Sequence, residues 1–187
     1  MKTTKKGFTL IELIVVIAII GVLAAILVPA MLGYVKKSKI QSANSAASTM
    51  LKAVNSALEE LDEEDYTVPS TLTTVGNGST DATADLIKTY MKEYSDDVSG
   101  NWKAQISNGV AIACAAKSGS YYGSSPQVWS NKNYGKSVDS STGKATGNAV
   151  TPSLDTALAQ AVAKYNYQHA TSVSTDTGST ESGGTEG

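Results

Sequence analysis

The sequence contains no arginine: its 15 basic residues are all lysines, and the formal net charge of the 187 residues is only −2. Nucleic-acid-binding proteins normally cluster arginine and lysine on one face. The composition therefore gives no support for a nucleic-acid-binding function.

Cysteine and histidine each occur once, as Cys114 and His169. A single cysteine excludes an intramolecular disulfide and a cysteine-rich metal site. Cys114 lies in the stretch GVAIACAAK, which predicts a small buried thiol, and His169 is expected at the surface beside a polar tail. The sequence also lacks zinc-ligand spacing, a phosphate-binding glycine loop and a nucleotide fingerprint. It therefore predicts neither an enzyme nor a resident cofactor or metal.

The first 35 residues contain a long apolar run. From Phe8 to Val35 the only charged side chain is Glu12. About 20 apolar residues span a bilayer core, so the run predicts a transmembrane helix. A secretory signal peptide would have a shorter apolar core and a small-residue cleavage site. Three lysines lie on each side of the run, so the positive-inside rule does not decide its orientation: Lys2, Lys5, Lys6, Lys36, Lys37 and Lys39.

Glu12 is unfavourable in such a run, because an intramembrane carboxylate is costly and usually has a partner. One interpretation is that its side chain reaches back to the lipid headgroups. The other needs a cation at the same depth, and cutting the chain after Gly7 would create one, the amine of Phe8. On a neighbouring subunit that amine and Glu12 can meet and neutralise each other within an apolar bundle.

The segment KKGFTLIELIVVIAIIGVLAAILVPAM, residues 5–31, resembles the N-terminus of type IV pilins and of the related pseudopilins of type II secretion systems. In that family a short basic leader ends in glycine, a membrane peptidase cuts the Gly–Phe bond, and the new N-terminal Phe is usually N-methylated. The resemblance implies cleavage between Gly7 and Phe8, methylation of Phe8 and a role in assembly for Glu12.

The resemblance also implies a location and partners. The leader, residues 1–7, is cytoplasmic, and the remainder lies outside the cytoplasm, anchored in membrane lipid before it joins a homo-oligomeric helical filament at the cell surface. Removal of the leader takes away three lysines and leaves a net charge of −5. This charge favours solubility of the exported part. The implied partners are a prepilin peptidase that is also the N-methyltransferase, an assembly platform with its ATPase, minor pilins and surface polysaccharide.

Beyond the membrane segment, residues 8–35, the helix is expected to continue through residues 36–62. Apolar residues there recur at spacings of three and four, which predicts an amphipathic helix with one buried stripe: Ile40, Ala43, Ala47, Met50, Val54, Leu58 and Leu61. The other face carries Asn44, Ser48, Lys52 and Asn55.

Two residues interrupt the regular pattern of the apolar run. Pro29 removes a backbone hydrogen bond and is expected to kink the helix, and Gly21 adds flexibility at about 1 kcal/mol against alanine. Both are compatible with packing in a membrane alone. In the context of the resemblance, we favour bending or partial unwinding as subunits leave the membrane.

The head, residues 63–170, is expected to be α+β, with a small antiparallel sheet packed on the long helix. An acidic run, residues 59–65, predicts a solvated loop. The alternative is that it pairs with a lysine-rich face of a neighbouring subunit, with Lys36, Lys37 and Lys39 as donors. A short helix follows within residues 77–97, capped by Ser79 or Thr80, with an apolar side formed by Leu86, Ile87, Tyr90, Met91 and Tyr94. The segment SDDVSGN, residues 95–101, predicts an ordinary turn rather than a calcium loop, because it matches no complete ligand pattern.

Three strands are expected at residues 102–107, 109–117 and 127–131, with a hairpin at Asn108-Gly109. Residues 133–150 predict a polar loop. Residues 151–168 resemble a helix with Thr151 as cap and Pro152 in its first turn, although the family usually lacks one there, so a helix at 153–168 stays open. The tail, residues 171–187, is expected to be disordered.

Aromatic residues gather in the strand region. Flat exposed rings can stack on sugars, so Trp102, Tyr121, Tyr122 and Trp129 are candidates for glycan contact; the alternative is packing in the core or at a filament interface, together with Tyr134.

Three functions are therefore compared: a type IV pilin, a type II secretion pseudopilin, and an adhesin on a pilin scaffold. The absence of a paired-cysteine loop departs from many Gram-negative major pilins and fits pilins of Gram-positive bacteria and pseudopilins equally well. The Ser/Thr-rich tail favours an exposed fibre, so a pilin is predicted, serving adhesion, motility or DNA uptake.

Overall fold

The computed structural model describes residues 7–96 and 100–175. Its internal contacts divide the chain into an N-terminal unit, Met1–Ser38, and a head, Lys39–Gly187. The long helix α1 (Leu10–Glu63) begins in the first unit and ends in the second. Leader residues 1–6 and residues 176–187 of the expected tail lie outside the described residues.

The part of α1 in the head buries the stripe that the sequence predicts. All seven predicted positions, from Ile40 to Leu61, are buried, together with Ala53 and Ala57. The helix continues through Glu63, one residue beyond its expected end at 62, so five of the seven residues of the acidic run are helical rather than in a loop. It ends where Asp65 adopts a left-handed conformation (φ 60°) and the Tyr66 amide donates to the Leu61 carbonyl at 2.9 Å, a common helix stop.

Four strands form an antiparallel sheet in the order β1-β2-β3-β4. Their bounds are β1 (Thr73–Gly76), β2 (Trp102–Ser107), β3 (Val110–Ser118) and β4 (Tyr121–Ser125). The predicted hairpin is confirmed: Asn108 and Gly109 between β2 and β3 both have positive φ, 51° and 75°, as a tight two-residue turn requires.

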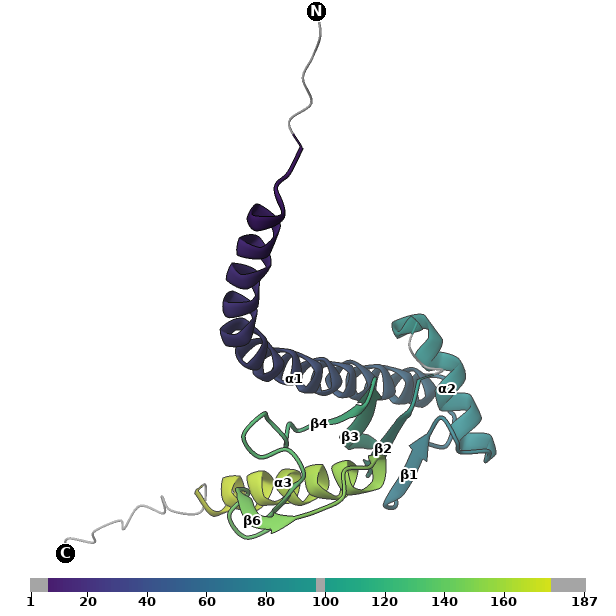
Figure 1. Ribbon diagram of the computed structural model, residues 1–187. Coiled ribbons are helices and arrows are strands. Elements are labelled where there is room, and N and C mark those ends of the chain that lie inside the picture. Colours follow the sequence, from purple (N-terminus) through teal and green to yellow (C-terminus); the bar gives the residue numbers. More distant parts are fainter. Residues whose placement is uncertain (1–6, 97–99, 176–187) are drawn as a thin grey trace, which may run out of the picture. The chain divides into compact units, whose positions relative to one another are not determined.

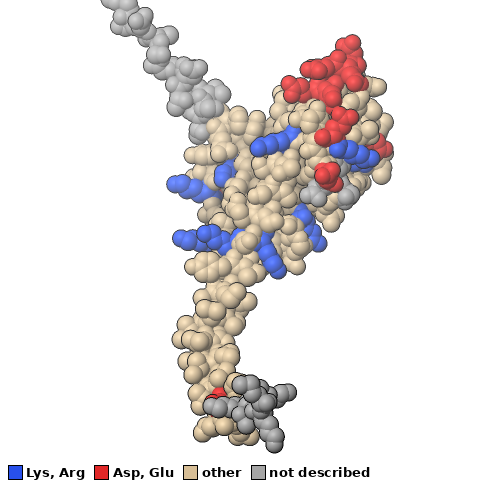
Figure 2. Space-filling view, turned by 90° about the horizontal axis from the view of Figure 1, so that it is seen from above, with Lys and Arg blue, Asp and Glu red and all other residues tan. Residues whose placement is uncertain are grey.

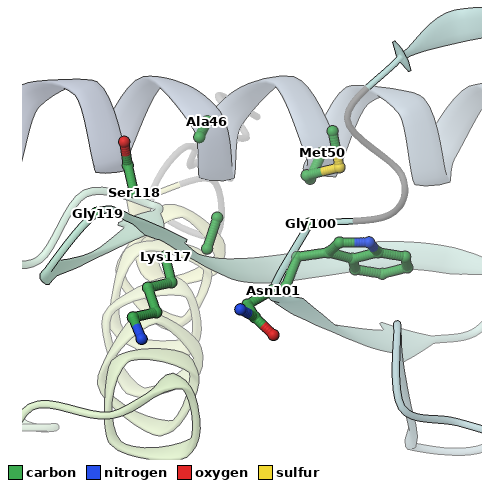
Figure 3. A pocket seen from close by; sticks show the side chains of 9 residues that line it. Ala46, Met50, Gly100, Asn101, Lys117, Ser118 and Gly119 are labelled. Atoms are coloured by element: carbon green, nitrogen blue, oxygen red, sulfur yellow. The ribbon is translucent and has the colours of Figure 1, made fainter.

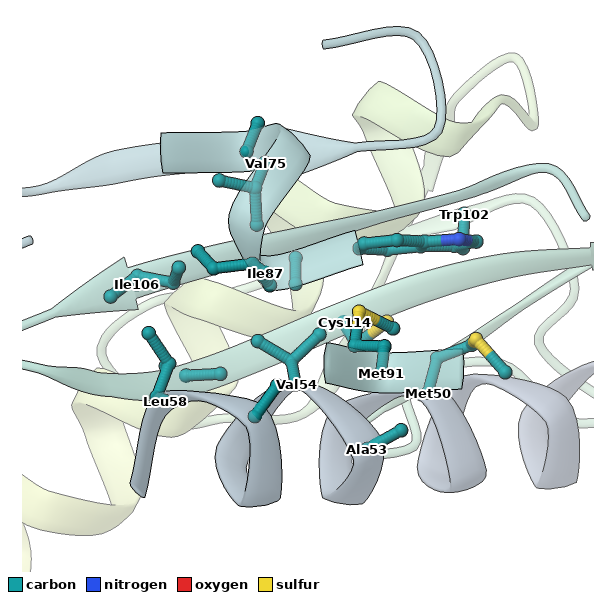
Figure 4. Packing of buried hydrophobic residues seen from close by; sticks show 14 of the residues in the cluster. Met50, Ala53, Val54, Leu58, Val75, Ile87, Met91, Trp102, Ile106 and Cys114 are labelled. Atoms are coloured by element: carbon teal, nitrogen blue, oxygen red, sulfur yellow. The ribbon is translucent and has the colours of Figure 1, made fainter. Parts of the chain in front are cut away.

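Helices cover both faces of this sheet (Figure 1). On one face, α1 and α2 (Ala82–Tyr94) enclose a core with Trp102 at one end and Ile106 at the other (Figure 4). On the opposite face, α3 (Leu154–Thr175) encloses a second core around Trp129. The α+β prediction is confirmed, and the helix that the sequence left open at 153–168 is present.

The last of the three predicted strands, β4 in the structure, lies earlier in the sequence than predicted. A turn at Gly119 (φ 57°) pairs Ser118 with Tyr121, so β4 occupies residues 121–125 instead of 127–131. The segment after β4 is irregular and packs the Trp129 ring into the second core, where the indole Nε1 donates to the Lys136 carbonyl at 2.8 Å. The β-branched and aromatic residues of 127–131 thus serve core packing rather than a strand.

The predicted loop at residues 133–150 contains a two-stranded sheet, β5 (Lys136–Val138) and β6 (Ala145–Ala149). Its short strands lack an apolar alternation that would reveal them. The turn between them is held by the Asp139 carboxylate, which accepts the Ser141 hydroxyl at 2.6 Å and the Ser141 amide at 2.8 Å. These hydrogen bonds lower the pKa of Asp139.

Two helix caps differ from the prediction. Asp81, rather than Ser79 or Thr80, caps α2 by accepting the Ala84 amide at 2.9 Å. For α3 the cap is Ser153 instead of Thr151, and its hydroxyl accepts the Thr156 amide at 3.1 Å. In addition, α3 continues through Thr175, so residues 171–175 of the expected disordered tail are helical.

Asn44 and Asn55, predicted on the polar face of α1, instead fasten that helix to the sheet. Asn44 is 4% exposed; its Oδ1 accepts the Ser124 amide at 3.0 Å, and its Nδ2 donates to the Trp129 carbonyl at 3.0 Å. Asn55 accepts the Ala111 amide at 2.8 Å and donates to the Ala111 carbonyl at 3.2 Å. An amide can pair with backbone in this way because it carries both a donor and an acceptor.

The Asn44 contact requires α1 and β4 to approach closely at Gly123. A Cβ atom at Gly123 would lie 2.2 Å from the Ala43 carbonyl carbon and from the Asn44 nitrogen. Both are backbone atoms, so neither can rotate away.

We therefore expect Gly123→Ala to lower the free energy of unfolding of the head by about 1–3 kcal/mol, the usual cost of overpacking. Urea unfolding followed by tryptophan fluorescence measures this. The matched control is Gly147→Ala in β6, where an added Cβ meets no atom within 4 Å. Equal stability of the two variants would contradict the close approach.

Candidate assembly site

The N-terminal part of α1 is not covered by any of the residues 7–96 and 100–175. Every residue from Gly7 to Lys39 is exposed, including each large apolar side chain from Phe8 to Val35. The helix is long and apolar enough to cross a membrane. A contiguous apolar surface of this extent marks a site that contacts lipid or other proteins.

Glu12 takes part in a capping box at the start of α1. The Glu12 Oε2 accepts the Thr9 amide at 2.9 Å and the Thr9 hydroxyl at 2.6 Å, while the Glu12 amide points at the Thr9 Oγ1, 3.4 Å away. Thr9 is therefore the cap, and Glu12 is the third residue of the helix, as the motif requires. Sequence reasoning missed this arrangement, although the T-x-x-E spacing was its signal.

The capping box leaves part of the carboxylate available. Both bonds to Glu12 use Oε2, and within the described residues Oε1 accepts no hydrogen bond. The negative charge lies in the first turn of α1, where the helix dipole favours it. The chain thus fixes the position of Glu12 while leaving one oxygen for a further donor.

The predicted cleavage pair, Gly7 and Phe8, lies just outside the helix. Phe8 is 87% exposed, and neither residue is part of α1. A Cβ atom at Gly7 would meet no atom within 4 Å. The fold of the described residues therefore does not require glycine here, and the capping box at Thr9 keeps the Gly7–Phe8 bond out of the helix.

Gly21 and Pro29, the predicted points of flexibility, both lie inside α1. Pro29 has no amide hydrogen, so the Ala25 carbonyl lacks its usual helical donor. A Cβ atom at Gly21 would likewise meet no atom within 4 Å. A requirement for glycine at this position must therefore come from neighbouring helices, to which a small residue allows close approach.

The structure corrects the glycan candidates among the tryptophans. Trp102 is 2% exposed and Trp129 is 0% exposed, so neither ring face is free to stack on a sugar. Tyr121 and Tyr122 are half-buried. Tyr134 makes edge contacts with Tyr121 and Trp129, each with ring centroids 5.3 Å apart. Core packing, the alternative interpretation, is thus confirmed for the two tryptophans.

A cavity of about 290 Å³ lies beside Trp102, between α1 and the ends of β2 and β3 (Figure 3). Met50 and Ala46 line it from the helix, and Asn101, Lys117 and Ser118 from the strand ends. Among the described residues that line it, Lys117 is the only titratable one, so these residues supply no acid–base pair.

Cys114 and His169 behave as the sequence predicts. Cys114 is fully buried, which raises the pKa of its thiol. His169 is exposed and stacks on Tyr165, with ring centroids 3.8 Å apart.

Among the residues that the structure describes, no group of three His, Cys, Asp or Glu side chains is placed to hold a metal ion. The calcium alternative includes residues 97–99, which lie outside the described residues.

The capping box predicts that Thr9→Val loosens the first turn of α1, because valine keeps the shape but loses the hydroxyl that bonds Glu12. Loss of a cap costs about 1 kcal/mol, so amide hydrogen exchange at residues 9–12 in detergent micelles should become about fivefold faster. Thr9→Ser, which keeps the hydroxyl, is the control. Unchanged exchange in Thr9→Val would contradict the capping box.

Comparison with known proteins points to the same N-terminal segment. The family model described as the prokaryotic N-terminal methylation motif matches residues 2–28. The type IV major fimbrial protein FimA of Dichelobacter nodosus is 45% identical over 58 residues, 31% of this chain and 37% of that protein. The type IV major alpha-pilin of Moraxella bovis is 50% identical over 56 residues, 30% of this chain and 35% of that protein.

A longer match extends into the head. A fimbrial protein of Neisseria meningitidis serogroup A is 33% identical over 120 residues, 63% of this chain and 59% of that protein. The matches thus span about a third to three-fifths of the relatives' length, and no solved structure matches the chain. The matched N-terminal motif and these relatives thus make the chain similar to type IV pilins and fimbrial proteins.

Proposed function

We propose that this chain is a structural subunit of a type IV pilus-like filament, anchored in the membrane by α1 before assembly and packed through the same surface afterwards. The observation that carries the proposal is the uncovered apolar surface of residues 8–35 with one carboxylate in its first helical turn. Lipid can cover this surface in the membrane, and equivalent helices can cover it in a filament.

The proposed maturation removes residues 1–7. A prepilin peptidase cuts between Gly7 and Phe8 and methylates the new amine of Phe8. The exposed position of this bond, outside α1, and the match of residues 2–28 to the methylation motif support this step. The leader is cytoplasmic, residues 8–35 form the anchor and filament core, and residues 36–170 face outward.

Assembly is proposed to join the Phe8 amine of one subunit to Glu12 of the next. Each charge is costly in an apolar bundle, and pairing offsets that cost. The capping box contributes by holding the carboxylate through Oε2, which leaves Oε1 for the incoming amine. The assembly platform with its ATPase and minor pilins are the expected further partners.

The two alternatives receive less support. The relatives are named as fimbrial proteins and pilins rather than as pseudopilins or enzymes. An adhesin that binds glycan through its aromatic rings would need exposed faces, and both tryptophans are buried. Adhesion, motility and DNA uptake remain the roles proposed for the filament itself.

Replacing Glu12 tests the charge pairing. We expect Glu12→Ala to leave membrane insertion and leader removal intact but to abolish or strongly reduce filaments, measured as sheared fibre protein against the membrane pool. Glu12→Gln separates charge from capping, because glutamine also serves in a capping box but carries no charge. Normal filaments from Glu12→Gln would contradict the pairing, whatever the alanine variant does.

Replacing Gly7 tests maturation. We expect Gly7→Leu to block leader removal, so mass spectrometry of the membrane protein should find the uncut chain, whereas the wild type begins with methyl-Phe8. Gly147→Leu controls for expression, because its site lies in β6 beside open space. A wild-type filament whose subunits retain residues 1–7 would refute the proposed route.

A further inference from the structure

We infer that an acidic groove on the head receives the lysine segment of a second copy of this chain. The inference rests on the proposed filament and adds a specific contact between its subunits. The groove has a volume of about 480 Å³ and lies between the C-terminal part of α1 and the β2–β3 hairpin. Its lining residues are Asn55, Leu58, Glu59, Asp62, Val68 and the hairpin tip at 108–110.

The groove combines two carboxylates with an apolar surface. Glu59 and Asp62 are three residues apart on α1, so their side chains lie on the same side of the helix. Half-buried Val68 adds apolar surface, and Val110 at the hairpin tip is 52% exposed. No lysine lines the groove, so it favours a ligand that is both cationic and aliphatic.

Neither carboxylate of the groove forms an ion pair with a lysine of the described residues. The ion pairs found among the described residues join Lys88 to Asp85 and Lys103 to Asp155, and neither includes Glu59 or Asp62. The last turn of α1 contains no basic residue, although a helix C-terminus favours cations and disfavours carboxylates. A lysine from outside would therefore relieve an unfavourable charge distribution.

The other carboxylates of the acidic run strengthen the negative potential around the groove, and at least one of them already has a partner within the chain. Glu64, for example, accepts the Tyr90 hydroxyl at 2.5 Å, which raises the pKa of Tyr90 to about 12. On the face shown in Figure 2, carboxylates gather in one area of the head, and most lysines lie away from it.

The complementary segment is on α1 itself. Lys36, Lys37 and Lys39 are all exposed and belong to neither ion pair of the described residues. They follow Val35, which is exposed as well. Lysine stems pack along apolar surface while the ammonium group reaches a charge, which matches Val110 and Val68 beside the two carboxylates.

The groove and the lysines of one molecule cannot meet. Lys39 and Glu59 are separated by about 30 Å along the helix, from the rise per residue. A second copy displaced by this amount along the helix axis brings its Lys39 to the groove of the first. Such a contact uses two different surfaces and therefore propagates from copy to copy, as in a filament. The Phe8–Glu12 pairing requires a shift of about one turn, so the two contacts join different neighbours.

Cysteine cross-linking tests the contact directly. Native Cys114 is fully buried, so introduced cysteines are the reactive ones. We expect the double variant Asp62→Cys, Lys39→Cys to form a ladder of disulfide-linked subunits in oxidised, sheared filaments and none in detergent-solubilised monomer. The matched control combines Lys39→Cys with Ser140→Cys, at the exposed tip between β5 and β6, and should give no ladder.

Charge reversal provides a second test. Glu59→Lys with Asp62→Lys, and separately Lys37→Glu with Lys39→Glu, should each cause a loss of filaments, and combining all four substitutions should restore them. Intact wild-type filaments without the cross-link or the rescue would overturn this inference and leave the proposed function standing. A ladder of equal strength with Ser140, or a cross-link from position 62 to a different protein, would also overturn it. Absence of wild-type filaments would instead refute the proposed function.

Discussion

An uncovered apolar helix surface is the constraint on which the other features depend. Residues 8–35 expose every large apolar side chain, and burial of such surface is the dominant favourable term in association. None of the residues that the structure describes covers it. The head therefore has to form its core from the other half of the same helix, which buries the stripe from Ile40 to Leu61.

The head is attached to a helix for which we also propose a role in assembly, and this attachment involves more than apolar contacts. Asn44 and Asn55 pair with backbone groups of three segments, around Ser124, Trp129 and Ala111. Breaking such a buried bond leaves an unsatisfied group, which costs more than the bond contributes. The two amides therefore fix the register of the sheet along α1, and Gly123 allows the close approach that Asn44 needs.

Periodicity and short motifs predicted much of this structure. The seven-residue stripe on α1, the Asn108-Gly109 turn and the buried Cys114 follow from local patterns. The sequence did not predict β5 and β6, whose strands are short and polar, or the position of β4, because Trp129 is needed in the core. Asn44 was assigned to solvent because its partners are 80 or more residues away. The T-x-x-E spacing of Thr9 and Glu12 is by itself the sequence signature of the capping box.

The helix on the second face of the sheet affects how the stability of the head depends on redox conditions. With α3 in place, each side of the sheet has its own apolar core, one around Trp102 and the other around Trp129. Domains with too little core commonly rely on cross-links between cysteines, but the lone thiol here is sealed inside. The head is thus held together by packing and hydrogen bonds without a disulfide, and its integrity does not depend on whether its surroundings are oxidising or reducing.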